Sequence, residues 1–484
     1  MKTIIFFDRC FLTHHFALMT KTLIKDYNVV HIASSDYDVQ ILAQNNITQN
    51  VFQFDKEIIN IYNSEQLNFD LIKEIDDFYS KNTNGDFCLN SAIYCDRAKE
   101  ILSYPDELHL AQSYYLFWKK ILNNFEVACV LHETTSVLMN HICSTMCRSK
   151  NIPYLSHQWG NGDVPYSYYY AEYDTHSNHT IKQQYELYLS HPELIDKERC
   201  DTYIEKFRKS FDIIYGGQKH INHSITNLLI KSIKERILQF TQRNKYDKIG
   251  NNVDYWLVRD RLWKRRLRNA VQYKKRIKFE EMVPGEKYFY YSFHLEPEAT
   301  ISYLNGGWYV NQVKLIENIA SSLPAGYYLY VKDHPHEYAY RDVIDYERLQ
   351  HIPNVRLLRQ DIPGKLVVKN AIGLFTINGT IGYEAILLGK PVFTFGKSYY
   401  SFYRGCYYIE NVKDIKNVVT QVLGSDNNCS ETLYAYLNAY FDASYSGAVL
   451  LFSDPSTLPA NINVEENAIL LSENLMNYLK KQSE

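Results

Sequence analysis

The chain has 484 residues, too many for one hydrophobic core, so two or three domains are expected. Hydrophobic residues make up 46% of the sequence and charged residues 22%, which excludes a disordered, fibrous or collagen-like protein. No run of about 18 apolar residues is present to span a bilayer, and Asp8 and Arg9 interrupt the first apolar stretch where a signal peptide would continue. We therefore expect a cytoplasmic protein with reduced cysteines.

The first half of the chain alternates apolar runs of strand length with helical stretches, which predicts a parallel sheet covered by helices. Ligands of open α/β sheets bind beyond the carboxyl ends of the strands, so the loop 157–163 is a candidate binding loop, with His157, Gln158 and Trp159 at its start. The tyrosine-rich run 166–170 could stack on a ligand or reflect the general abundance of tyrosine. The predicted strands are 3–7, 28–32, 127–131 and 153–155, and the predicted helices are 13–25, 94–124 and 134–149.

The net charge of −3 conceals a strongly basic segment. Residues 231–281 hold 16 lysines and arginines but 6 acidic residues, which predicts an anionic partner: membrane lipid, nucleic acid or a phosphorylated substrate. Within residues 255–278, apolar side chains recur at helical spacing among basic ones, so this helix could lie on an anionic inner-membrane surface. The alternative is a helix packed on a core. A nucleic-acid partner is not expected, because no nucleic-acid module is recognisable.

A second alternation of strands and helices follows Pro284 and Gly285. The predicted fold class is α/β, with two Rossmann-type domains facing a cleft, a helical linker and C-terminal helices. The expected domains are 1–280, which includes the linker from about 180 to 280, then 281–425, and 426–484, which packs back on the first domain. The predicted strands are 287–291, 326–332, 354–358, 371–376 and 391–395, with helices at 309–322, 379–388 and beyond 412.

Common catalytic signatures are absent from the sequence. There is no P-loop and no G-x-G-x-x-G after the first strand. His132 and Glu133 begin like a zinc-protease motif, but Ser136 replaces its second histidine. Cys143 and Cys147 lie one helical turn apart without a fourth ligand, so we interpret them as buried thiols. No metal ion or cofactor is therefore expected.

Four short polar clusters lie between residues 292 and 400, and each follows a predicted strand. Because successive parallel strands end at the same edge of a sheet, the clusters are expected to converge on one site. The clusters are residues 292–300, 332–335, 376–385 and 389–400.

The third cluster has the features of a nucleotide site. Asn378, Gly379 and Thr380 open a predicted helix, whose free backbone N–H groups and positive dipole end can bind phosphate. Glu384 lies one turn further, where its carboxylate can accept two hydrogen bonds from a ribose diol. The alternatives are a simple helix cap and an ordinary surface glutamate. The fourth cluster adds Gly396, Lys397 and Ser398.

The first two clusters offer charged and acid–base groups. Pro335 holds His334 extended at a strand exit, where the imidazole can donate to a phosphate oxygen or to a reacting carboxylate. Lys332 could add a charge for phosphate, or could be a solvated lysine. Glu296 and Glu298 lie in a loop, where a carboxylate can act as base or nucleophile, and at least one of them is expected to be structural.

The order of these motifs resembles a known family. The motifs are H-L-E-P-E-A-T-I from His294, K-D-H-P from Lys332, T-I-N-G-T-I-G-Y-E-A from Thr376 and G-K-P-V-F-T-F-G from Gly389. Together they resemble the capsule polysaccharide synthesis family, which includes the bacterial Kdo transferases of capsule and O-antigen assembly. The resemblance covers about residues 286–400.

This resemblance implies a two-domain glycosyltransferase of the GT-B type that transfers Kdo or a related sugar from a CMP-activated donor with retention of configuration. It places Glu298 on a catalytic aspartate, His334 on the histidine of a His-Pro motif, and residues 378–384 on the nucleotide-binding turn and helix. Two positions depart from the family: Glu298 is one methylene longer than aspartate, and His294 stands where glutamine is common.

We therefore expect an enzyme of surface-polysaccharide biosynthesis, with the donor on domain 281–425 and a lipid-linked or polysaccharide acceptor on domain 1–280. Glu298 would attack the anomeric carbon as CMP leaves, and no metal ion is expected because a helix dipole and basic side chains can offset the phosphate charge. His157, Gln158 and Trp159 would bind the acceptor. The alternatives are a UDP- or GDP-sugar transferase, an epimerase of the same fold, and an inactive binding or scaffold subunit.

Overall fold

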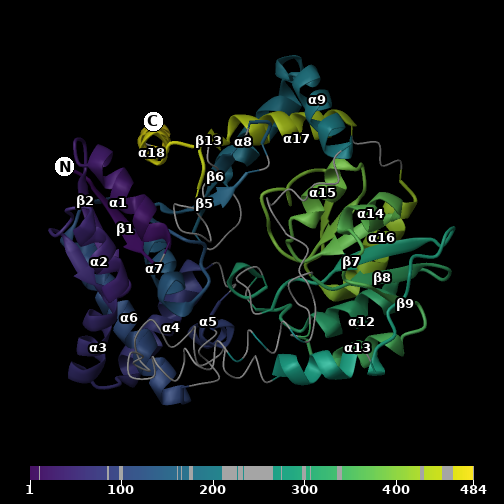
Figure 1. Cartoon of the computed structure of the whole chain (residues 1–484), viewed down its shortest axis with the longest axis horizontal. Coiled ribbons are helices and arrows are strands. Elements are labelled where there is room, and N and C mark those ends of the chain that lie inside the picture. Colours follow the sequence, from purple (N-terminus) through teal and green to yellow (C-terminus); the bar gives the residue numbers. More distant parts are fainter. Residues whose placement is uncertain are drawn as a thin grey trace. The chain divides into compact units, whose positions relative to one another are not determined.

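The computed structural model divides into two compact units (Figure 1). Unit 1 comprises Met1–Asn178, Asn244–Tyr255 and Phe441–Glu484, and unit 2 comprises His179–Arg243 and Trp256–Tyr440. The structure describes residues 1–9, 11–83, 87–96, 102–160, 162–164, 166–173, 178–209, 226, 230, 233, 265–273, 275–296, 301–305, 307–334, 339, 341–425, 430–449 and 462–482.

Unit 1 is built on a seven-stranded sheet with the order β13-β6-β5-β4-β1-β2-β3. Strands β1 to β5 are parallel to one another, and β6 and β13 extend one edge of the sheet through antiparallel pairs. Strand β1 is buried along its whole length and apolar from Ile4 to Phe7, as expected for a parallel strand covered on both faces. The strands are β1 (Thr3–Asp8), β2 (Asn28–Ala33), β3 (Val51–Gln53), β4 (Val127–His132), β5 (Tyr154–Trp159), β6 (Ser167–Glu172) and β13 (Tyr445–Ser446).

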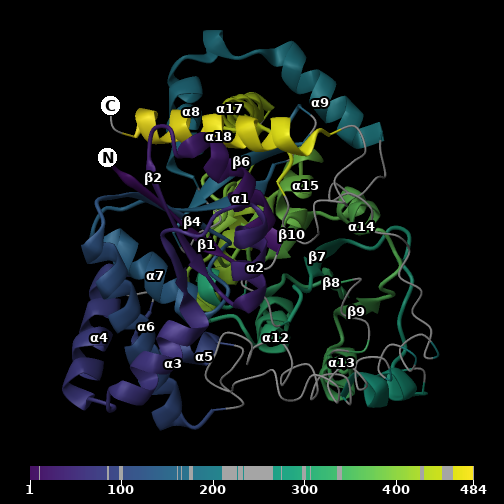
Figure 2. The ribbon, with the colours of Figure 1, turned by 60° about the vertical axis from the view of Figure 1, so that its left-hand side comes forward.

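Helix α18 lies beside α1, although the two are far apart in the sequence (Figure 2). Leu471 and Leu475 of α18 share one hydrophobic core with Leu12 and Phe16 of α1. The last helix of the chain therefore completes the core that the first residues begin. The helices of unit 1 are α1 (Phe11–Leu23), α2 (Asp36–Gln44), α3 (Phe54–Ser64), α4 (Phe69–Asn82), α5 (Leu89–Cys95), α6 (Tyr104–Asn124), α7 (Leu138–Ser149) and α18 (Val464–Lys481).

Unit 2 is built on a six-stranded sheet with the order β12-β11-β10-β7-β8-β9, in which every pair is parallel. Counted from β7, this is the strand order of a Rossmann fold, and the direction of strand addition reverses between β7 and β10. The five strands predicted for this half of the chain are confirmed. The strands are β7 (Tyr288–Ser292), β8 (Tyr328–Lys332), β9 (Val355–Leu358), β10 (Gly373–Thr376), β11 (Val392–Thr394) and β12 (Cys406–Tyr408).

Helices cover both faces of the sheet of unit 2. Phe289 and Tyr291 of β7 join the core formed with α12, α13 and α16, whereas Tyr288 points to the other face and donates a hydrogen bond to the Val367 carbonyl of α14. The helices are α8 (His179–Ser190), α9 (Lys197–Lys209), α12 (Gln312–Ser322), α13 (Val343–Gln350), α14 (Gly364–Asn370), α15 (Ile381–Leu387), α16 (Ile415–Leu423) and α17 (Ser430–Asp442), with 3₁₀ turns at η2 (Pro192–Leu194), η4 (Tyr303–Asn305) and η6 (Val412–Asp414).

The predicted fold class, α/β with two Rossmann-type domains and additional helices, is confirmed. The predicted boundary at residue 280 is not where the chain divides, because helices α8 and α9 and residues 265–278 belong to unit 2. Ala270, Tyr273 and Ile277 are buried in the core of that unit, which explains the assignment. The second boundary falls within α17 instead of at residue 425. Among the described helices, none combines the length and the apolar character needed to cross a membrane.

Candidate functional site

The predicted polar clusters lie where strands of unit 2 end. Residues 293–296 follow β7, residues 333–334 follow β8, residues 377–380 follow β10 and residues 395–398 follow β11. These strands are adjacent and parallel, so their carboxyl ends share one edge of the sheet, at the reversal between β7 and β10. Glu298 and Pro335 lie outside the described residues, and their predicted roles stay predictions.

The turn between β10 and α15 is held by side chains from two other segments. The Ile377 N–H donates to His294 Nε2 at 3.2 Å, and the Thr376 hydroxyl lies 3.1 Å from the same nitrogen. On the other side, the Tyr400 hydroxyl donates to the Gly379 carbonyl. The side chains of His294 and Tyr400 therefore hold the backbone of the predicted nucleotide-binding turn in place.

Two expectations about this turn are corrected by its geometry. The Gly379 N–H already donates to Thr376 Oγ1 at 3.1 Å, so it is not free for a phosphate. Helix α15 begins at Ile381, has seven residues and receives no side-chain cap from Thr380, so its dipole is shorter than a helix over 379–388 predicts. Gly379 is needed for close packing, because a Cβ there would lie 3.0 Å from His294 Cε1.

Glu384 and Lys332 have pKa values shifted by burial. Desolvation raises the pKa of Glu384 to about 7, against the opposing charges of Lys365 and Lys332. Desolvation lowers the pKa of Lys332 to about 8, against the charges of Asp333, Asp361 and Glu384. Glu384 is therefore not an ordinary surface residue, and Lys332, which is 4% exposed, is not a solvated lysine.

The ammonium of Lys332 is engaged by backbone. Its Nζ donates to the carbonyls of Asp333 at 3.3 Å and of Gln360 at 3.4 Å. Lys332 thus joins the ends of β8 and β9, and its positive charge acts on the carboxylate of Glu384. A phosphate contact by Lys332 remains a prediction that would use its remaining donor.

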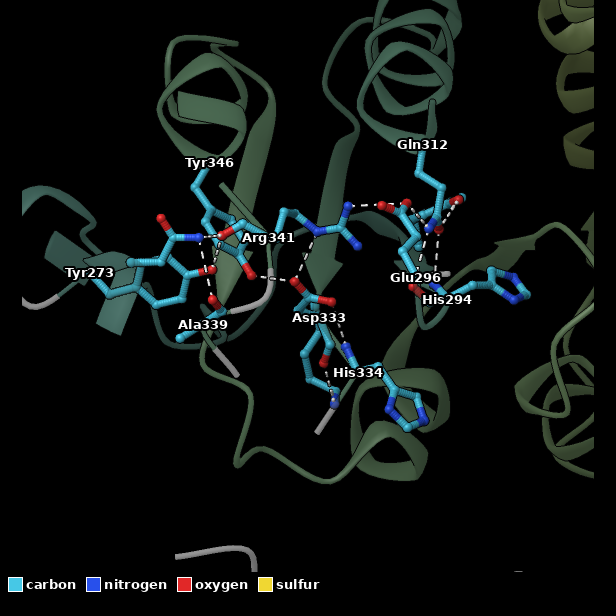
Figure 3. A network of polar contacts seen from close by, with 12 residues as sticks. Tyr273, His294, Glu296, Gln312, Asp333, His334, Ala339, Arg341 and Tyr346 are labelled. Atoms are coloured by element: carbon cyan, nitrogen blue, oxygen red, sulfur yellow. Dashed lines mark hydrogen bonds and ion pairs between the residues drawn. The ribbon is translucent and has the colours of Figure 1, made fainter. Parts of the chain in front are cut away.

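A network of ion pairs and hydrogen bonds follows β7 and β8 (Figure 3). The buried carboxylate of Asp333 accepts from Arg341 Nε at 3.0 Å, from the hydroxyl of Tyr346, and from the His334 N–H at 2.8 Å. Arg341 Nη1 also lies 3.2 Å from Glu296 Oε1. In Figure 3 the imidazole of His334 points away from this network.

Gln312, the first residue of α12, orders the loop after β7. Its Oε1 accepts from the His294 N–H at 2.8 Å and from the Tyr291 hydroxyl at 3.0 Å, and its Nε2 donates to the His294 carbonyl and to Glu296. No role was predicted for Gln312, Arg341, Asp333 or Tyr400, although Asp333 and Tyr400 lie inside the second and fourth predicted clusters.

The fourth cluster lies beside the turn after β10. The Gly396 N–H donates to the Ile377 carbonyl at 2.9 Å, and the Phe395 N–H donates to Thr376 at 3.2 Å. Ser398 is buried, whereas Lys397 is exposed. The structure therefore brings Gly396 and Ser398 next to the predicted nucleotide-binding turn and leaves the Lys397 ammonium available to a ligand in solution.

The predicted acceptor residues of unit 1 are not in a loop. His157, Gln158 and Trp159 belong to β5 and pair with Tyr168–Tyr170 of β6, because the chain turns back as an antiparallel strand. His157 is buried against the rings of Tyr168 and Tyr170, and burial lowers its pKa to about 3. His157 and the tyrosines 168–170 are therefore core residues of unit 1, and not the ligand contacts that were considered for them.

Gln158 and Trp159 have partners of their own in unit 1. Gln158 donates to the hydroxyls of Thr134 and Ser156, and the Trp159 indole donates to the Val449 carbonyl at 2.8 Å. Trp159 is 38% exposed, so part of its ring can still meet a ligand. Among the three predicted acceptor residues, Trp159 is the one whose surroundings still suit that prediction.

Two further predictions concern cysteines and the basic segment. Cys143 and Cys147 are buried free thiols, as predicted, and burial raises the pKa of Cys143. Within the described residues, no group of three or more His, Cys, Asp or Glu side chains is arranged to hold a metal ion.

The basic segment is described only in part, because residues 255–264 lie outside the described part of the chain. In the part that is described, Ala270 faces the core of unit 2 while Val271 is exposed.

Comparisons with known proteins agree with the motifs. The family described as capsule polysaccharide biosynthesis protein matches residues 198–418. No curated protein matches the chain.

Similar solved structures include UDP-GlcNAc 2-epimerase from Neisseria meningitidis bound to UDP-GlcNAc (13% identity, 99% of this chain and 100% of that chain, TM-score 0.27). They also include KpsC, a beta Kdo 2,4 transferase from Thermosulfurimonas dismutans (13% identity, 64% and 79%, TM-score 0.31), and the spinosyn rhamnosyltransferase SpnG complexed with spinosyn aglycone (11% identity, 91% and 97%, TM-score 0.28). These superpositions are too loose to assign an activity. The family match spans the four motifs, so the predicted resemblance to the capsule polysaccharide biosynthesis family is confirmed over residues 198–418.

Proposed function

We propose that this protein is a glycosyltransferase of surface-polysaccharide biosynthesis, whose sugar-nucleotide donor binds at the carboxyl edge of the sheet of unit 2. The observation that carries the proposal is the convergence of the family motifs on one edge of a Rossmann-type sheet, beside the reversal between β7 and β10. We infer a glycosyltransferase activity because all four family motifs lie at this one edge of the sheet.

The proposed donor contacts come from several loops. The turn from Asn378 to Thr380 would contact phosphate, and the carboxylate of Glu384 would accept from the ribose hydroxyls. The imidazole of His334 and the exposed ammonium of Lys397 would add donors for phosphate oxygens, with the Lys332 charge nearby. By its resemblance to the Kdo transferases, the donor would be CMP-Kdo or a related CMP-activated sugar.

The proposed chemistry is a double displacement. The carboxylate of Glu298 would attack the anomeric carbon, the bond from that carbon to the phosphate oxygen would break, and CMP would leave with the bonding electrons. An acceptor hydroxyl would then displace the carboxylate and give up its proton, so that two inversions yield net retention. Basic side chains and backbone N–H groups would offset the phosphate charge, and for that reason we propose that no metal ion takes part.

The experiment is a turnover assay with the purified protein, CMP-Kdo and a lipid-linked or oligosaccharide acceptor, with CMP release and product mass as readouts. We expect CMP release in the presence of EDTA, and its loss to near background in Glu298→Gln, because a carboxamide is nearly isosteric but a poor nucleophile. Binding of CMP to the Glu298→Gln variant should persist, which separates loss of chemistry from loss of folding.

Other outcomes of the same assay would replace the proposal. Turnover of UDP- or GDP-sugars instead of CMP-Kdo would make the protein a different transferase, or an epimerase if no acceptor is needed. Nucleotide binding without turnover of any donor would make it a binding or scaffold subunit. A panel of nucleotides in a thermal-shift assay distinguishes these cases, since a ligand at 100 times its Kd adds about 2.7 kcal/mol of stability.

We also propose that the protein works at the cytoplasmic face of the inner membrane, where a lipid-linked acceptor would be found. The support is the basic segment, in which Arg268, Lys275 and Lys278 are exposed. The packing of Ala270 and Ile277 in the core of unit 2 limits any apolar insertion by the described part of this helix. Its attraction to a membrane would therefore be mainly electrostatic.

A further inference from the structure

Arg341 joins the loop after β7 to the end of β8. Its side chain is 3% exposed, with Nε 3.0 Å from Asp333 Oδ2 and Nη1 3.2 Å from Glu296 Oε1 (Figure 3). The guanidinium also lies 3.8 Å from the centroid of the Phe293 ring. One planar cation thus contacts two carboxylates from two different loops and one aromatic face, an arrangement that a lysine ammonium cannot reproduce.

The arginine itself is held in place from the other side. The Arg341 carbonyl accepts from Asn269 Nδ2 at 2.9 Å and from the Tyr273 hydroxyl, and both residues belong to the described part of the basic segment. Tyr346 of α13 donates to the same carboxylate of Asp333. The backbone of Arg341 is therefore held by residues of the core of unit 2.

This geometry distinguishes the two glutamates of the loop after β7. Oε1 of Glu296 contacts both Arg341 and Gln312, so two side chains from other segments hold this carboxylate in place. A carboxylate tied in this way is poorly placed to travel to an anomeric carbon.

We propose that Arg341 is a positioning residue of the site and that Glu296 is its structural partner, not the reactive carboxylate. Arg341 fixes Glu296, and with it residues 293–296, relative to Asp333 and the backbone of His334. This inference rests on the proposed function for its chemical meaning, because only a transferase with a reactive Glu298 would gain from such a tether.

The kinetic test compares Arg341→Met, Arg341→Lys, Glu296→Gln and the double variant Arg341→Met/Glu296→Gln. We expect Arg341→Met to lower kcat by roughly 10- to 100-fold with little change in the KM of the donor, because a small misplacement of a reacting group is sufficient for such a loss. Arg341→Lys should recover part of the activity. The double variant should be hardly worse than Arg341→Met, since the two residues act through one contact.

The matched control is Arg356→Met. Arg356 is also an arginine with two carboxylate partners, Glu280 and Glu286, and it stacks on Tyr328, but its partners precede β7 in the chain. Its loss should lower the melting temperature to a similar degree without a selective fall in kcat. An equal fall in kcat in Arg356→Met at matched stability would overturn the proposal, because the effect would then be one of general stability.

Two further results separate this inference from the proposed function. Glu296→Gln should keep measurable turnover, whereas Glu298→Gln should not; a Glu296→Gln variant as inactive as Glu298→Gln would overturn the assignment of roles. Amide hydrogen exchange in the absence of ligand should become faster across residues 293–305 in Arg341→Met but not in Arg356→Met. If the wild type turns over no sugar nucleotide, the proposed function fails, and this exchange result alone decides whether Arg341 orders the loop; unchanged exchange refutes it.

Discussion

Glu384 and Lys332 show how burial prepares individual residues at the site. Lys332 is buried and Glu384 is half-buried, and desolvation moves the two pKa values toward neutrality from opposite directions, to about 8 and about 7. Each charge partly offsets the cost of burying the other. Small changes in pH around neutrality therefore change the charge of the surface that would receive a ribose.

The first prediction concerns the pH dependence of nucleotide binding. An ionised carboxylate is the better acceptor for ribose hydroxyls, and Glu384 ionises as the pH rises through about 7. The Kd for CMP, measured by calorimetry, should therefore fall between pH 6 and pH 8. In Glu384→Gln the part of this dependence that comes from Glu384 should disappear, which leaves the titration of the CMP phosphate, whose second pKa is about 6. Glu384→Ala should weaken binding by about 1.5–3 kcal/mol. The same pH dependence in the wild type and in Glu384→Gln would show that Glu384 is not a ligand contact.

The second prediction concerns a buried glutamate away from the site. Glu107 of α6 is 3% exposed, and its Oε1 has no hydrogen-bond partner in the described part of the chain. Desolvation and the nearby charges of Asp96 and Asp106 raise its pKa to about 7. The folded protein then holds a proton that the unfolded chain releases above about pH 4.5, so this group makes stability fall as the pH rises from 4.5 to 7.

Glu107→Gln removes that titration. With about 1.4 kcal/mol per pKa unit, we expect the variant to be more stable than the wild type by roughly 1–3 kcal/mol at pH 8 and nearly equal to it at pH 4.5. Denaturant unfolding at the two pH values measures the difference. The same stability gain at both values would mean that the titration of Glu107 does not contribute.

Residue-scale prediction from sequence succeeded where a residue stands in a local pattern. Glu384 follows the start of a helix by one turn, and His334 precedes a proline at a strand end, so both could be placed at the edge of the sheet. Arg341 and Gln312 could not, because their partners are 45 and 16 residues away in the chain and come together only when the loops do. His157 was misplaced because β6 pairs with it, and no local signal announces that pairing.

At the scale of elements, the turn from β10 into α15 depends on close packing. A Cβ at Gly382 would lie 2.4 Å from the Tyr400 hydroxyl and 2.6 Å from its Cζ, so the ring occupies the space that a side chain would need. The same hydroxyl holds the Gly379 carbonyl. Glycine at 382 is therefore required so that Tyr400 can reach the turn.

The third prediction follows from this packing. Gly382→Ala should displace the Tyr400 ring, release the Gly379 carbonyl and weaken CMP binding, with a smaller loss of overall stability. Tyr400→Phe, which keeps the ring and removes the hydroxyl, should weaken binding less than Gly382→Ala. Calorimetry with CMP and thermal unfolding of both variants measure the two effects. If Gly382→Ala binds CMP normally, the turn does not need this contact.

Elements were predicted well where apolar periodicity is uninterrupted, and less well at their ends. The helix predicted over residues 94–124 covers α6 and only the last two residues of α5. At the start of α6 the Ser103 side chain accepts from the Asp106 N–H, and Pro105 lies in the first turn. Both residues are start signals for a helix. The short edge strands β3 and β12 were missed, since strands of three residues leave little pattern to detect.

At the scale of the whole molecule, the sequence predicted two Rossmann-type units but placed their boundary too late. The helical character of residues 180–278 suggested a linker, whereas α8, α9 and residues 265–278 complete unit 2. Burial of Tyr273 and Ile277 depends on the partner surface, which helical periodicity alone does not identify. The packing of the C-terminal helices on the first domain was expected, but the specific contacts of α18 with α1 in one hydrophobic core were not.

The fourth prediction tests the basic segment as a membrane contact. Binding to vesicles of anionic lipid should be salt-sensitive, binding to neutral vesicles weak, and reversal of Arg268, Lys275 and Lys278 to glutamate should reduce sedimentation, because each nearby basic residue contributes about 1 kcal/mol. A control that reverses Lys73, Lys119 and Lys120 in unit 1 should have little effect. Equal sedimentation with anionic and neutral vesicles at low salt would leave the segment a structural part of unit 2.

The central claim is that the carboxyl edge of the sheet of unit 2 binds a sugar nucleotide. A crystal structure of the protein with CMP tests it most directly, because it locates the ligand without assuming an acceptor or an activity. We predict that the phosphate lies at the turn Asn378–Thr380, with the ribose hydroxyls within hydrogen-bond distance of Glu384 and the His334 imidazole turned toward the phosphate. CMP bound elsewhere on the protein, or contacts that leave both this turn and Glu384 untouched, would contradict the account.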